Sequence, residues 1–145
     1  MSAKILVVDN SAACQLTIKN MLSDYNILTA SNDFEAMHQI NTNIDIDLII
    51  LDLNMLKMNG DFEFLNALKS DKRYKNIHTI ILSNYVDYEN DIKTLELKSV
   101  DYIQKPVNIE YLKSRINIHL QFLRVQKLYE EMILSSDMTL DTILN

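Results

Sequence analysis

The chain contains very little cysteine, proline or glycine, since each occurs once in 145 residues. The single cysteine, Cys14, excludes an intrachain disulfide and fits a reducing compartment. One proline and one glycine leave no flexible linker of that composition. Because 145 residues are enough for one well-buried core and too few for two ordinary domains, we expect a single domain.

Long hydrophobic runs and clustered positive charge are also missing. The apolar run that follows Met1–Lys4 has only a few residues, far fewer than a signal peptide or a membrane span needs. The net charge is -6, and the 14 Lys and Arg residues are scattered, whereas a surface that binds nucleic acid needs them clustered. We therefore expect a cytoplasmic protein that binds neither membranes nor nucleic acid.

Short apolar runs alternate with segments of helical periodicity along the chain. Strands are predicted at residues 5–8, 27–30, 47–51, 78–82 and 100–103. Helices are predicted at residues 11–23, 31–40, 62–68, 87–97 and from 109 onward. This alternation favours an α/β fold with one doubly wound, five-stranded parallel sheet and helices on both faces. The reactive crevice of such a sheet lies outside the carboxyl ends of its strands.

Apolar spacing within the first two helices predicts which side chains share a face. In the first helix Leu16, Met21 and Leu22 recur at helical spacing. In the second helix Phe34, Met37 and Ile40 lie on one side, after a capping segment at residues 31–33. We expect these apolar side chains to face the sheet.

The last helix is unusually long for a domain of this size. Its apolar residues stay at spacings of three and four up to Leu123, and Leu128 and Met132 continue the pattern after a shift of phase. Roughly 27 helical residues span about 40 Å, more than such a domain covers. We therefore expect a domain at residues 1–122 and a helical extension at 123–145. The extension either folds back on the domain or forms a coiled-coil stalk that leads toward an output region.

A polar or charged residue stands at the end of four predicted strands: Asp9, Asp52, Ser83 and Lys105. The carboxyl ends of parallel strands meet at one edge of a sheet, so we expect these side chains to lie together. Carboxylates that converge repel one another, and Mg2+, which prefers oxygen ligands, relieves the repulsion. Asp52 can then attack a phosphoryl group to give an aspartyl phosphate. The metal and Lys105 would neutralise the phosphoryl oxygens, and the Ser83 hydroxyl would donate a hydrogen bond to one of them.

Five motifs stand in a recognisable order and spacing along the chain. They are Ile5-Leu6-Val7-Val8-Asp9, Leu51-Asp52-Leu53-Asn54-Met55, Met58-Asn59-Gly60, Ser83 and Asp101-Tyr102-Ile103-Gln104-Lys105-Pro106. Together they closely resemble the receiver domain of two-component response regulators, over about residues 3–122. The resemblance implies a flavodoxin-like sheet with strand order 2-1-3-4-5.

The resemblance also implies a chemical role for Asp52 and its neighbours. Asp52 would be the phosphoacceptor, loaded from a phosphohistidine on a histidine kinase or a histidine phosphotransfer protein. Mg2+ would bind to Asp9, Asn10, Asp52 and the backbone carbonyl of Asn54. Like other receivers, the domain would catalyse its own phosphorylation and slow dephosphorylation without being an enzyme for a metabolite.

Three further residues would carry the response to phosphorylation. Lys105 would pair with the phosphoryl group, and the peptide bond between Lys105 and Pro106 would be cis. Ser83 and Tyr102 would form the switch pair, in which the hydroxyl moves toward the phosphate and the ring turns inward. The shifted equilibrium would change the face that contains the last helix, which we expect to be the output element and a site of homodimerisation.

The sequence departs from the family's pattern at several places around Asp52. Asn10 stands where a second acidic residue is usual, which should weaken Mg2+ binding. Asn84 replaces a small residue and could narrow access to the phosphoryl site, and Leu56 replaces a common proline. Tyr85 could shield the acyl phosphate from water.

Two other functions fit parts of the same pattern. A pseudo-receiver that accepts no phosphate and serves as a docking or dimerisation module is favoured by Asn10 and Asn84. A phosphatase like the haloacid dehalogenases, or a flavodoxin-like activity, would use the same architecture. Against these enzymes, Asn54 stands in place of a second aspartate, and no Gly-rich phosphate cradle occurs.

The three histidines add no second site to this prediction. His38, His78 and His119 are far apart in the sequence, and none adjoins an acidic residue at a spacing typical of metal ligands. We therefore expect them to be structural or surface residues.

Overall fold

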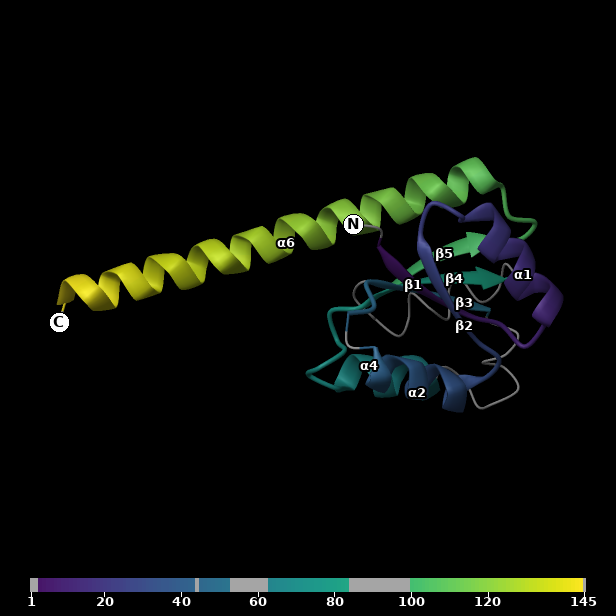
Figure 1. Ribbon diagram of the computed structural model, residues 1–145, viewed down its shortest axis with the longest axis horizontal. Helices are drawn as coiled ribbons and strands as arrows, with labels where there is room; N and C mark the ends of the chain where they lie inside the picture. Colours follow the sequence, from purple (N-terminus) through teal and green to yellow (C-terminus); the bar gives the residue numbers. More distant parts are fainter. Residues whose placement is uncertain (1–2, 44, 53–62, 84–99, 145) are drawn as a thin grey trace.

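The computed structural model describes residues 3–43, 45–52, 63–83 and 100–144. Its elements, in chain order, are β1 (Lys4–Val8), α1 (Ala12–Met21), β2 (Asn26–Ala30), α2 (Asp33–Thr42), β3 (Leu48–Asp52), α4 (Glu63–Ser70), β4 (His78–Ser83), β5 (Val100–Gln104) and α6 (Ile109–Leu144). The strands form one parallel sheet in the order β2-β1-β3-β4-β5 (Figure 1), which confirms the predicted fold. The helix predicted at residues 87–97 lies outside the described residues.

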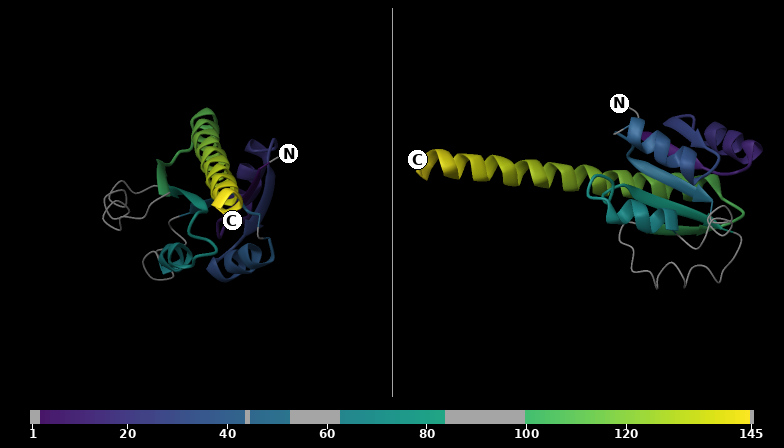
Figure 2. Two further views of the ribbon diagram at one scale, coloured as in Figure 1. Left: turned by 90° about the vertical axis from the view of Figure 1, so that its left-hand side faces the viewer. Right: turned by 90° about the horizontal axis from the view of Figure 1, so that it is seen from below.

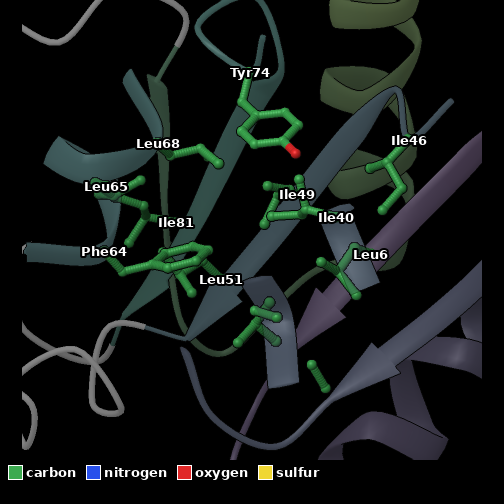
Figure 3. Close-up of a cluster of buried hydrophobic side chains, with 13 residues drawn as sticks. Leu6, Ile40, Ile46, Ile49, Leu51, Phe64, Leu65, Leu68, Tyr74 and Ile81 are labelled. Atoms are coloured by element: carbon green, nitrogen blue, oxygen red, sulfur yellow. The ribbon is translucent and has the colours of Figure 1, made fainter. Parts of the chain in front are cut away.

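The strands are apolar because both faces of the sheet are covered. Successive side chains of a strand point to opposite faces, so each strand contributes to two clusters. On the face of α2 and α4 (Figure 3), the buried residues include Leu6, Ile40, Ile49, Leu51, Phe64, Leu65, Leu68 and Ile81. On the face of α1 and α6, they include Ile5, Val7, Ile18, Leu22, Leu48, Ile50, Ile80, Leu82, Leu112 and Ile116.

Polar side chains cap three of the helices at the places that the sequence indicates. The Ser11 hydroxyl accepts from the backbone N–H of Cys14 at 3.2 Å, at the start of α1. The Asn32 side chain accepts from the N–H of Glu35 at 2.8 Å, at the start of α2. Asn108 accepts from the N–H of Tyr111 at 3.0 Å, at the start of α6. Each cap satisfies a backbone donor that the first helical turn leaves unpaired.

The faces predicted for α1 and α2 are partly wrong. Leu16 is 59% exposed and Phe34 is 83% exposed, so neither packs against the sheet. Ile18 of α1 and Ala36 of α2 are buried instead. Each of these buried residues lies two positions beyond the misassigned one, about 200° around the helix. The predicted core residues Leu22 and Ile40 are buried as expected.

Helix α6 (Ile109–Leu144) extends straight away from the domain (Figures 1 and 2). It has 36 residues and therefore spans about 54 Å. Its first turns bury Leu112 and Ile116 against the sheet, whereas the side chains of Val125 and Leu128 are exposed. The alternative of a helix folded back on the domain is therefore wrong, because the second half of α6 projects beyond it.

Candidate functional site

The polar residues predicted to converge stand at the same edge of the sheet. Asp9 directly follows β1, Asp52 ends β3, Ser83 ends β4 and Lys105 directly follows β5. Asp9, Asp52 and Ser83 are buried although all three are polar. Burying a polar group costs free energy unless the group has a hydrogen-bonding or charged partner. The partners of these three residues therefore indicate the chemistry of this edge.

Asp52 and Lys105 form an ion pair at this edge. The Lys105 Nζ donates to Oδ2 of Asp52 at 2.7 Å, and only 7% of the Asp52 side chain is exposed. The backbone N–H of Lys105 donates to the carbonyl of Ser83 at 2.7 Å, which fixes the start of the loop after β5. The peptide bond between Lys105 and Pro106 is cis, as the resemblance implies. Lys105 thus reaches a carboxylate that lies two strands away.

Asp9 lies beside Asp52 and is held by the loop that begins α1. Its Oδ1 accepts from the N–H of Ser11 at 2.9 Å, and its carbonyl accepts from Nε2 of Gln15 at 2.6 Å. Burial raises the pKa of Asp9, and the neighbouring Asp52 carboxylate raises it further, although the Ser11 N–H and the Lys105 charge act in the opposite direction. Two carboxylates therefore lie side by side and share the charge of Lys105.

The residues at this edge fit a hard divalent cation such as Mg2+. Asp9 and Asp52 supply carboxylate oxygens, and a cation between them would relieve the repulsion that raises the pKa of Asp9. Asn10 follows Asp9 and is exposed. Among the residues that the structure describes, no cluster of three or more His, Cys, Asp or Glu side chains could hold a metal. The donor set is thus poor in charge, which fits a weak site.

The two predicted switch residues share one face of the sheet. Ser83 is paired in register with Gln104, and Tyr102 is paired with Ile81. Because alternate residues of a strand share a face, Ser83 and Tyr102 both point toward the side of α2 and α4. Tyr102 is half-buried and packs against the cluster on that side. The other predicted residues near Asp52 lie outside the described residues: Asn54, Leu56, Asn84 and Tyr85.

Sequence reasoning missed a polar network that joins α6 to the sheet. Oδ2 of Asp101 accepts from Nε and Nη2 of Arg115 at 2.7 and 2.6 Å, and lies 3.0 Å from Nε2 of His119. Nδ1 of His119 lies 2.8 Å from Nδ1 of His78. Oδ1 of Asp101 accepts from the N–H of Tyr102 at 2.8 Å. Arg115 and His119 are four residues apart, so they share a face of α6, and this spacing was the available signal.

Electrostatics define the protonation of this network. Burial opposes the charge of Asp101, but hydrogen bonds from His119, Arg115 and the Tyr102 N–H outweigh it and lower the pKa of Asp101. Burial, together with His119 and Lys69, lowers the pKa of His78 to about 4. His78 is therefore neutral near pH 7. The two histidines are structural, as expected, but they act as a hydrogen-bonded pair.

Residues 5–117 match the family model of the response regulator receiver domain. The chain belongs to this family. It is 32% identical over 118 residues to the chemotaxis protein CheY1 of Helicobacter pylori. This alignment covers 79% of this chain and 94% of that protein. The structure resembles that of a response regulator receiver domain protein from Clostridium thermocellum, with a TM-score of 0.72, 29% identity, and coverage of 87% of this chain and 98% of that one.

The receiver domain also occurs as part of a longer relative. The chain is 34% identical over 117 residues to a probable cyclic di-GMP phosphodiesterase of Vibrio cholerae. The match covers 81% of this chain but only 26% of that protein. Within the described part of this receiver, no helix is both long enough and apolar enough to cross a membrane.

Proposed function

We propose that this receiver is a phosphorylation-controlled switch in which Asp52 accepts a phosphoryl group from a phosphohistidine. The donor would be a histidine kinase or a histidine phosphotransfer protein. A bond forms between an Asp52 carboxylate oxygen and phosphorus, and the phosphorus–nitrogen bond of the donor imidazole breaks. The proposal rests chiefly on the buried Asp52 carboxylate at a strand end, with the Lys105 ammonium 2.7 Å away.

The neighbours of Asp52 have separate roles in this reaction. Asp9, Asn10, Asp52 and the backbone carbonyl of Asn54 would hold Mg2+, which neutralises phosphoryl oxygens when it is bound. Lys105 already points at Asp52, so its positive charge meets the incoming phosphoryl oxygens without a large rearrangement. The receiver would also accept phosphate from small donors and lose it slowly, without turning over a metabolite.

The response would pass from Asp52 to α6 through β5. The Ser83 hydroxyl would move toward the phosphoryl group and the Tyr102 ring would turn further inward, which biases an existing equilibrium. The N–H of Tyr102 donates to Asp101, whose other oxygen binds Arg115 of α6. A movement of β5 at Tyr102 is therefore passed to Arg115 of α6 through the Asp101 side chain. A coupling of about 1 to 3 kcal/mol is typical of such switches.

Two further predictions on the chain as a whole stay open. We propose that residues 1–122 are the receiver and that residues 123–145 are a helical extension that passes the signal on. A cytoplasmic location follows from the expectation of a reducing compartment and from the cytoplasmic kinase that the proposal needs. Homodimerisation through α6 is treated separately below.

Beryllofluoride, which mimics a phosphoryl group on a carboxylate, tests the proposal at Asp52. In millimolar Mg2+ it should shift the NMR signals around Asp52 and Lys105, and Asp52→Asn should abolish the shift. A small phosphodonor should add one phosphoryl group in an intact-mass measurement. The variant Asn10→Asp should lower the Mg2+ concentration needed for half of the response, because it adds a carboxylate to the site.

A docking module that accepts no phosphate is the second candidate function. It is favoured by Asn10, which follows Asp9 at the position where an acid would add charge to the donor set. This candidate predicts no added mass and no shift with beryllofluoride, even at high Mg2+ concentration. That result would contradict the phosphoacceptor proposal.

A further inference from the structure

Helix α6 carries two apolar stripes on opposite sides. The first stripe faces the sheet, with Leu112 and Ile116 buried and Leu120 packed beside them. The second stripe, here called the seam, consists of side chains that are 52% to 68% exposed: Ile118, Phe122, Val125, Tyr129 and Met132. Met132, which was expected to continue the apolar pattern after a shift of phase, belongs to the seam.

The seam has the spacing of a coiled coil. Its residues follow one another at intervals of four, three, four and three, which is the heptad alternation of core positions. At 3.6 residues per turn, the five side chains fall within a sector of about 80°. The stripe formed by Leu112 and Ile116 lies on the other side of the helix. The seam begins beside the domain, where the rings of Phe122 and His78 lie 5.4 Å apart, and it continues along α6, which leaves the domain (Figure 2).

The charges of α6 avoid the seam. Between residues 117 and 135 the charged side chains are Arg124, Lys127, Glu130 and Glu131, and all four are exposed. By helical geometry they lie on the side of α6 away from the seam. Their charges cancel, so this stretch of helix adds nothing to the repulsion between two copies of an acidic protein.

Beyond His119, which binds Asp101 of the domain, the positions that flank the seam are uncharged. Gln121 and Leu128 precede core positions, and Gln126 and Ile133 follow them. In coiled coils these flanking positions select the partner, usually by opposite charges on two different helices. Uncharged flanks instead let two identical helices meet without like charges facing each other. The occupant that this pattern fits best is a second copy of the same helix.

We infer that two copies of this chain pair through the seam, with their α6 helices parallel and in register. Phe122 and Tyr129 then meet their counterparts in aromatic layers, and Ile118, Val125 and Met132 meet theirs in aliphatic layers. The inference deepens the proposed function because α6 is its output element. It does not require a phosphoryl group on Asp52, so the two proposals can fail separately.

Disulfide cross-linking tests the register of the pair. In a Cys14→Ser background, Val125→Cys places one thiol in the seam, and Arg124→Cys places one a single residue away on the charged side. In a parallel, in-register pair the two Cα atoms at position 125 come within about 4.4 to 6.8 Å, the range of a disulfide. Mild oxidation should therefore link Val125→Cys into dimers and leave Arg124→Cys mostly unlinked. Equal cross-linking of the two variants would overturn the inference.

Sedimentation of the full chain tests the pairing itself. The unaltered protein should form a concentration-dependent dimer, and Val125→Glu should make it monomeric. Asn117→Glu adds the same charge off the seam and should leave the dimer intact. Because Val125 and Asn117 are exposed, neither change should alter the circular dichroism of the folded domain. An unaltered chain that stays monomeric up to submillimolar concentration would overturn the pairing.

The outcomes separate this inference from the phosphoacceptor proposal. A monomer whose Asp52 responds to beryllofluoride contradicts the pairing alone. A dimer that cross-links at Val125→Cys and ignores beryllofluoride contradicts the phosphoacceptor proposal alone and supports the pairing.

Discussion

Asp52 and Lys105 show how a site can be charged and still buried. Removing a carboxylate from water is costly, and the Lys105 ammonium at 2.7 Å offsets that cost. The negative charge of Asp9 is less well compensated, because Asp9 shares Lys105 with Asp52. The burial of Asp9 also raises its pKa. Repulsion between the two carboxylates is therefore part of the site before any phosphoryl group arrives. This repulsion is the physical reason to expect a divalent cation there.

His78 should make the stability of the domain depend on pH. Its pKa is about 4 in the folded state and near 6.5 when unfolded. Between pH 6.5 and 4, His78 therefore binds a proton in the unfolded chain but not in the folded chain. Stability should therefore fall as the pH drops from 6.5 toward 4. With allowance for solvent screening, the loss between pH 7 and 5 is on the order of 1 kcal/mol. Urea unfolding at both values should show a smaller loss for His78→Phe, and an identical pH slope for the two proteins would refute this.

The strands and the site followed from the sequence because they depend on local patterns and one topological rule. Apolar runs mark the strands, and parallel pairing then brings Asp9, Asp52 and Lys105 to one edge. The faces of α1 and α2 followed only in part: Leu22 and Ile40 are buried as expected, but Leu16 and Phe34 are exposed. Periodicity alone does not say which stripe meets the sheet. The contact between His78 and His119 joins residues 41 positions apart, which only the tertiary structure brings together.

Asp101 should hold α6 against the sheet. Asp101→Asn removes the charge that pairs with Arg115 and His119, both of which are mostly shielded from water. The free energy of unfolding should fall by about 2 kcal/mol, because Arg115 is left without its counter-ion. Hydrogen exchange along residues 112–123 should also become faster.

An exposed ion pair gives the matched control for Asp101. Lys4 binds Asp45 at 2.9 Å, but 68% of the Asp45 side chain is exposed. Asp45→Asn should therefore leave the free energy of unfolding almost unchanged. Equal losses for the two variants would mean that burial of the Asp101 network contributes nothing to the attachment of α6.

The whole molecule divides into a packed domain and a helix that leaves it, and the two parts should be separable. A chain that ends at Arg124 keeps the buried residues of α6, Leu112 and Ile116, and loses most of the seam. Its free energy of unfolding should stay within about 1 kcal/mol of the unaltered value, because the removed apolar side chains with known exposure are in contact with water. It should still respond to beryllofluoride at Asp52, yet sediment as a monomer. A truncated chain that unfolds would show that the domain extends beyond residue 122, and one that still dimerises would place the interface outside the seam.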